Sequence, residues 1–88
     1  MTKWVQVNLA EIYRGLTAPE LVDVWKKQDK NNYYDIRIEH KPTARIHKPY
    51  QVYLTHTSFV YHGFPKILAS FSTRTEALKF VKRYIKTH

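Results

Sequence analysis

Lysine and arginine gather in the second half of this 88-residue sequence, where they could bind the phosphate groups of a polyanion. Up to Glu39, six basic residues are balanced by six acidic ones. From His40 onward, nine basic residues face one acid, Glu76. The net charge of +8 therefore arises entirely in the second half. Phosphates attract such side chains and release condensed counterions on binding, so this asymmetry indicates a polyanionic partner.

The basic side chains of the second half fall in three segments: a loop from residue 41 to 49 that contains two prolines, a turn near residue 66, and a predicted C-terminal helix. The predicted phosphate contacts are Lys41, Arg45, Lys48, Lys66, Arg74, Lys79, Lys82, Arg83 and Lys86. The alternative for the helical lysines is a solvated face that complements the helix dipole. The three segments make one binding surface only if the fold brings them to the same side.

Two tyrosines and one arginine lie on the polar phase of the predicted strands. Exposed tyrosines on a sheet can stack on unpaired bases, each stack contributing about 1–3 kcal/mol. We therefore predict base or stacking contacts from Arg37, Tyr33 and Tyr53. The alternative is that the tyrosines only reflect the general preference of tyrosine for strands and pack under a loop or a partner.

Other kinds of site have little support in the sequence. The chain has no cysteine, which excludes disulfides, thiolate catalysis and cysteine-based zinc sites. His56 and His62 are six residues apart, a separation that suits neither a helix face nor a strand face, so no metal and no cofactor are expected. Gly-rich phosphate loops and nucleophile elbows are also lacking, and we predict a non-enzymatic protein. A small nuclease remains the enzymatic alternative, because catalytic groups can converge from distant positions.

The elements that must position these residues are predicted from periodicity and capping signals. Alternating apolar residues predict strands over residues 4–7, 33–40 and 50–54, with a bulge or turn near 55–58 where the alternation slips. A turn at residues 62–65 leads to a last predicted strand over residues 66–72. Capping boxes begin two helices, one at Thr17 that runs to about Gln28 and one at Thr73 that runs to about Lys86. A helix-turn-helix over residues 8–28 is disfavoured because Glu20 and Asp23 would repel DNA.

We therefore predict one α+β domain over residues 1–88, with element order β-α-β-β-β-α. The expected architecture is a small antiparallel sheet of three to four strands with two helices packed on one face. No stretch approaches the roughly 20 apolar residues of a membrane span, and the N-terminus lacks a secretory signal, so a cytoplasmic protein is expected.

The segment from Leu68 to Phe80 contains the pattern F-x-T-x-x-E-A between a predicted strand and a predicted helix. It resembles the end of the arm-type DNA-binding domain of tyrosine recombinases, in which a three-stranded sheet reads the major groove and a helix backs it. The resemblance covers only this last part of the chain. The predicted strand and helix at the N-terminus depart from that pattern.

The sequence as a whole predicts a nucleic-acid-binding protein, with DNA preferred over RNA, of the small basic regulatory or mobile-element (phage) type. The main alternative is a protein-binding module or inhibitor that docks an acidic partner through its basic C-terminal half. A third hypothesis is a homodimer that pairs through the tyrosine-bearing face of the sheet.

Overall fold

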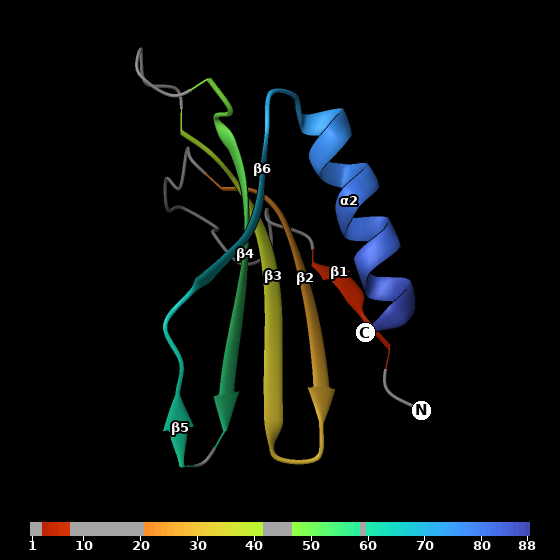
Figure 1. Ribbon diagram of the computed structural model, residues 1–88. Helices are drawn as coiled ribbons and strands as arrows, with labels where there is room; N and C mark the ends of the chain where they lie inside the picture. The colour runs from red at the N-terminus through yellow and green to blue at the C-terminus, as the bar shows by residue number, and fades with distance from the viewer. Residues whose placement is uncertain (1–2, 8–20, 42–46, 59) are drawn as a thin grey trace, which may run out of the picture.

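An antiparallel sheet crossed on one face by a helix dominates the computed structural model (Figure 1). The structure describes residues 3–7, 21–41, 47–58 and 60–88. The strands are β1 (Val5–Val7), β2 (Leu21–Asp29), β3 (Asn32–His40), β4 (Tyr50–Ser58), β5 (Tyr61–His62) and β6 (Lys66–Phe71), and the helix is α2 (Arg74–Thr87). Strands β1 to β4 follow one another across the sheet, and β5 and β6 both pair with the far edge of β4. The sheet is therefore five strands wide.

The predicted fold class is wrong, because the chain from Leu21 to Asp29 is a strand and not the second half of a helix. This strand pairs with β1 on one edge and with β3 on the other. Val22 and Val24 are β-branched and favour such a position, and pairing on both edges outweighs a local capping signal. The capping box at residues 17–20 lies outside the described residues. The helix-turn-helix interpretation fails for the same reason, since its second helix is β2.

The predicted interruption near residues 55–58 is also wrong. β4 pairs with β3 in unbroken register from Tyr50 to Ser58. The irregularity lies on the other edge of β4, where Ala69 pairs with Val52 and Ile67 pairs with Tyr53. Leu68 is thus the extra residue of a bulge in β6. The long pairing with β3 keeps β4 regular, so the extra residue is accommodated as a bulge in the short edge strand β6.

The remaining elements are confirmed. β1 and β3 fall where alternation predicted them, β6 falls where the last strand was predicted, and α2 begins where the second capping box placed it. The Thr73 hydroxyl oxygen accepts a hydrogen bond from the backbone N–H of Glu76 at 3.2 Å, which satisfies one of the free donors of the first helical turn. The side chain of Glu76 accepts a bond from the same hydroxyl at 3.0 Å.

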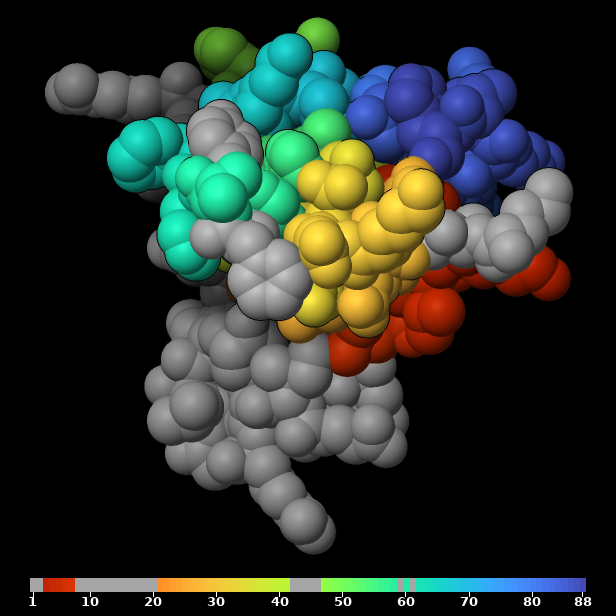
Figure 2. Space-filling view, turned by 90° about the horizontal axis from the view of Figure 1, so that it is seen from below, coloured from red at the N-terminus to blue at the C-terminus, as the bar shows by residue number. Residues whose placement is uncertain are grey.

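The core lies between α2 and the face of the sheet that it covers. Its buried members are Trp25, Ile36, Ile38, Val52, Ala77 and Val81. Full burial of one large aliphatic side chain stabilises a fold by about 1.5–3 kcal/mol, so this layer fixes α2 on the sheet. Seen from below, α2 (blue) lies on one side of β2 and β3 (orange to yellow) (Figure 2). The opposite face of the sheet, which bears Tyr33, Asp35 and Tyr53, is called here the second face.

The turn between β2 and β3 contains a strained backbone position. Asp29 pairs with Asn32, which leaves a two-residue turn, and Lys30 has a φ of 56°. A left-handed conformation costs a residue with a Cβ about 1–2 kcal/mol, and glycine avoids that cost. We expect Lys30→Gly to raise the free energy of unfolding by about 0.5–1 kcal/mol in urea denaturation. Lys30→Ala controls for loss of the side chain, and equal effects of both substitutions would contradict the explanation.

Candidate nucleic-acid interface

The outer surface of α2 carries a compact row of positive charge. Its members, called here the α2 stripe, are Lys79, Lys82, Arg83 and Lys86, and all four are exposed. Their spacing of three, four and seven residues places them on one side of a helix, away from the buried Ala77 and Val81. At 1.5 Å per residue, the stripe extends about 10 Å along the helix axis. None of its members forms an ion pair with any part of the chain that the structure describes.

Arg74, a predicted phosphate contact at the start of α2, is bound to a carboxylate. Its Nε lies 3.0 Å from Oδ2 of Asp23 in β2, and one of its terminal nitrogens lies 3.0 Å from Oδ1 of the same carboxylate. The Asp23 side chain is only 5% exposed, whereas that of Arg74 is 53% exposed. Gln6 also donates to Asp23 at 3.3 Å. The hydrogen bonds to Asp23 raise the pKa of the Arg74 guanidinium. Arg74 therefore fastens the start of α2 to the sheet, and two of its five N–H donors are engaged by Asp23.

Arg37, a predicted base contact, lies on the second face between two carboxylates of its own strand. Its Nε is 3.7 Å from Asp35 Oδ1, and a terminal nitrogen is 3.9 Å from Glu39 Oε2. Both carboxylates are near enough to attract this guanidinium, although neither distance is short enough for a hydrogen bond. Contact between Arg37 and an anionic ligand would therefore have to compete with both acids.

The two predicted stacking tyrosines differ in accessibility. Tyr53 is 9% exposed, the Lys41 ammonium lies 5.1 Å from its ring centroid, and its hydroxyl donates to Gln51 at 2.5 Å. Tyr33 is 46% exposed. Both side chains share one sheet face, as their strand phase predicted, but only the ring of Tyr33 is open to a base. Lys41, beside Tyr53, is on the second face and not with the α2 stripe.

Two other predicted phosphate contacts, Lys66 and Lys48, lie on the α2 side of the sheet or close to the start of α2. Lys66 pairs with Leu54, in a row of the register that continues through Ile36 to Trp25 in the core beneath α2. Lys48 is exposed next to His47, whose carbonyl accepts a hydrogen bond from Ser72 at 3.5 Å, close to the start of α2. Arg45 lies outside the described residues. The basic segments thus divide between the two sides of the sheet and do not form one surface.

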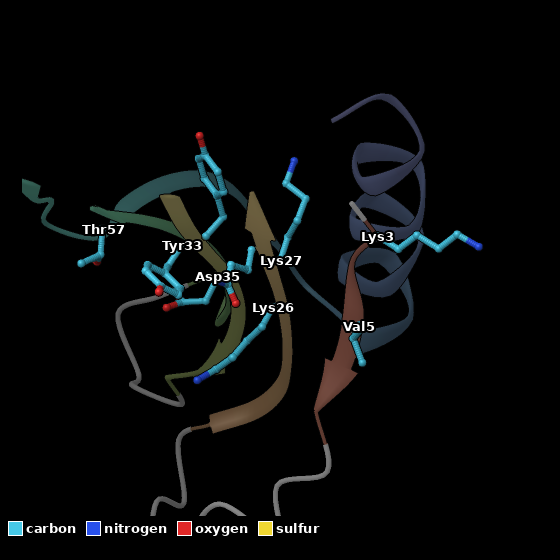
Figure 3. Close-up of a pocket in the computed structure, with 9 residues that line it drawn as sticks. Lys3, Val5, Lys26, Lys27, Tyr33, Asp35 and Thr57 are labelled. Carbon is cyan, nitrogen blue, oxygen red and sulfur yellow. The ribbon is translucent and has the colours of Figure 1, made fainter. Parts of the chain in front are cut away.

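A second group of lysines comes from the half of the sequence whose charges balance. Lys3, Lys26 and Lys27 line a hollow of about 470 Å³ with Tyr33, Asp35 and other residues (Figure 3). The zero net charge of the first half of the sequence gave no indication of these three lysines. Of the acids that balance them in the sequence, Asp23 is paired with Arg74, whereas Asp35 lines the hollow itself. The sequence contained one indication of a basic site here. Lys26 and Lys27 are adjacent, and a polar turn that leads to Tyr33 follows them.

The end of α2 is held beside β1 and β2 by an aromatic cluster. The Lys27 ammonium lies 4.9 Å from the ring centroid of Trp4 and 5.0 Å from that of Tyr34. It also donates a hydrogen bond to the carbonyl of His88. Tyr34 stacks on His56 with 4.7 Å between ring centroids. This cluster holds the last turn of α2, and Figure 1 shows that the end of the helix lies beside β1.

Asp35 gives a prediction of pH dependence. Burial raises the pKa of its carboxyl above the ordinary value of 3.8, and Arg37 and Lys26 offset this only in part. The folded protein therefore binds the proton more tightly than the unfolded chain does. Ionisation of Asp35 thus costs stability as pH rises from about 4 through the folded pKa. We expect Asp35→Asn to stabilise the protein at neutral pH by less than about 1 kcal/mol, since the site is partly solvated.

Urea denaturation at pH 7 and at pH 3.5 would test this expectation, with the gain present at pH 7 and lost at pH 3.5. Asp29→Asn makes the same change of charge at an exposed position in the turn and serves as the control. An Asp35→Asn variant that is less stable at pH 7 than the wild type would show that pairing with Arg37 outweighs the cost of burial.

Comparisons with known proteins add no relative. No family model, no curated protein and no solved structure matches the chain. The resemblance of residues 68–80 to arm-type domains therefore stays a local similarity, although the strand and helix that it implies are present as β6 and α2.

No helix among the described residues is long and apolar enough to cross a membrane. In the same residues, no three His, Asp or Glu side chains gather as metal ligands would.

Proposed function

We propose that this protein is a non-enzymatic nucleic-acid-binding domain and that the α2 stripe binds the phosphate backbone. The observation that carries the proposal is the exposure of four cations on one side of α2, without an acidic partner in the described chain. Asp23, Asp35 and Glu39, by contrast, lie close to arginines on the sheet. The helix therefore presents four adjacent positive charges that remain available to a ligand.

The dimensions of the stripe suit a nucleic-acid strand. Phosphates of one strand of duplex DNA recur about every 3.4 Å along the helix axis, so a row about 10 Å long spans about three of them. Lysine and arginine ends are flexible enough to follow either a duplex or a single strand. Lys66, on the same side of the sheet, can add a further contact at the sheet edge. The geometry thus supports binding to the phosphate backbone without base readout by α2.

The proposal is tested by fluorescence-polarisation titration against single- and double-stranded DNA and RNA of equal length. We expect binding at about 50 mM salt and a loss of affinity of about 100-fold at about 200 mM, as about four released counterions would give. Polyglutamate of matched charge is the control for the alternative, an acidic protein partner. Undetectable binding to every nucleic acid, or tighter binding to polyglutamate, would overturn the proposal.

A further inference from the structure

The hollow on the second face is built from two neighbouring rows of the sheet. In one row, Lys26 pairs with Val5 on one side and with Asp35 on the other. In the next row whose side chains point to the same face, two residues away along each strand, Tyr33 pairs with Gln28 and with Thr57. All six residues line the hollow. Its volume of about 470 Å³ falls within the range of small-ligand sites, and Figure 3 shows Tyr33, Lys26 and Asp35 on the same side of the strands.

The side chains around the hollow combine an aromatic surface with cations. Tyr33 offers a half-exposed ring, and the side chains of Lys26 and Lys3 are exposed. Neither lysine lies within ion-pair distance of an acid among the residues that the structure describes, although Lys26 is opposite Asp35 in the register and its charge opposes the rise in the pKa of that carboxyl. An aromatic ring beside exposed ammonium groups is the combination with which proteins hold single-stranded nucleic acids, because the ring stacks on a base and the cations bind the adjoining phosphates.

Asp35 gives the hollow a hydrogen-bond acceptor. Its side chain is among those that line the hollow, and about a third of it is exposed. A carboxylate only accepts hydrogen bonds, so the exposed part of Asp35 can accept one from a donor on a ligand in the hollow.

A path of positive charge leads from the α2 stripe to the hollow. Lys86 is in the last turn of α2, and the neighbouring His88 carbonyl accepts a hydrogen bond from Lys27 in β2. Lys27 lines the hollow together with Lys3 and Lys26. A flexible strand that follows the stripe can therefore pass round the short edge strand β1 to the second face. A stiff duplex cannot make that turn without a cost of several kcal/mol.

We propose that the hollow binds one unpaired nucleotide of a single-stranded nucleic acid, with its base stacked on Tyr33 and its phosphates held by Lys26 and Lys3. The inference rests on the proposed function and names its preferred ligand. Asp35 accepts a hydrogen bond from the amino group of the base. Cytosine, adenine and guanine carry an exocyclic amino group, whereas thymine and uracil carry a carbonyl oxygen in its place and offer only the ring N3–H as a donor. The hollow therefore favours bases that carry an amino group over thymine and uracil.

The test compares the affinities of the wild type and of Tyr33 variants for single-stranded oligodeoxycytidylate and oligothymidylate of equal length. We expect Tyr33→Ala to weaken binding to oligodeoxycytidylate by about 10-fold or more, in line with the measured contribution of base stacking. Tyr33→Phe, which keeps the ring, should bind as the wild type does. Asp35→Ala, which removes the acceptor, should abolish the preference for oligodeoxycytidylate over oligothymidylate. Thermal unfolding of each variant shows whether the fold is retained.

The outcomes separate this inference from the proposed function. If Tyr33→Ala is folded and binds as the wild type does, while charge reversal of the α2 stripe abolishes binding, the hollow is not a nucleotide site and the proposed function stands. If the wild type prefers oligothymidylate, the role of Asp35 is contradicted. If the wild type binds none of the oligonucleotides, both proposals fail. A selective loss of binding to oligodeoxycytidylate in folded Tyr33→Ala supports both.

Discussion

Reversal of three charges in the α2 stripe, by Lys79→Glu, Lys82→Glu and Arg83→Glu together, should lower the affinity for nucleic acid by at least about 100-fold at about 50 mM salt. Each lost phosphate contact removes close to one unit from the slope of log affinity against log salt, so this slope should become about three units less steep. All three side chains are exposed and make no ion pairs in the described chain, so the fold should be unaffected. Titration by fluorescence polarisation gives both quantities.

Two controls distinguish a binding surface from a general effect of net charge. The variant with Lys79→Arg, Lys82→Arg and Arg83→Lys keeps the charges and should retain binding. Lys82→Glu and Lys30→Glu change the net charge equally, but Lys30 lies in the turn between β2 and β3. We expect Lys82→Glu to weaken binding several-fold more than Lys30→Glu does. Equal losses would show that α2 is only a solvated face.

Arg74→Ala should destabilise the protein by about 2–3 kcal/mol, because it leaves the nearly buried carboxylate of Asp23 without its bidentate partner. This loss of stability is smaller than the loss expected for a fully buried ion pair, because half of the Arg74 side chain is in water. The same substitution should change nucleic-acid affinity less than two-fold, since the guanidinium already binds Asp23 in the free protein. Urea denaturation and a binding titration measure the two effects.

A double-mutant cycle isolates this interaction. Asp23→Leu removes the buried charge, and in that background Arg74→Ala should cost much less than in the wild type. Arg74→Lys keeps the charge but cannot form the bidentate pair, so it should be intermediate in stability. A loss of affinity for Arg74→Ala as large as that for the α2 stripe reversal would instead return Arg74 to the set of phosphate contacts.

Sequence patterns predicted some elements well because local and tertiary preferences agree there. β3 has strict alternation, with Ile36 and Ile38 in the core and Arg37 on the second face. α2 has both a capping residue and an apolar stripe. β2 was missed because Trp25 and its neighbours also fit a helical spacing, and the pairing with β1 and β3 that decides between strand and helix is a long-range property.

The candidate site was predictable only in part, for two physical reasons. The sequence identified the α2 stripe because neighbours on one helix face are set by local periodicity. Lys3 and Lys26 meet at the hollow only through the register of β1, β2 and β3, which no local pattern contains. Tyr33 and Tyr53 have the same strand phase, yet only the fold makes one accessible and the other buried.

The central claim, that nucleic acid lies against the outer surface of α2, is tested most directly by mapping the contact residue by residue. In a titration of the isotope-labelled protein with a single-stranded oligonucleotide, followed by NMR, we predict the largest amide and side-chain shifts at residues 79–86. Smaller shifts should follow at Lys26, Lys27 and Tyr33. Saturating shifts confined to residues outside α2, or no shifts at low salt, would contradict the claim.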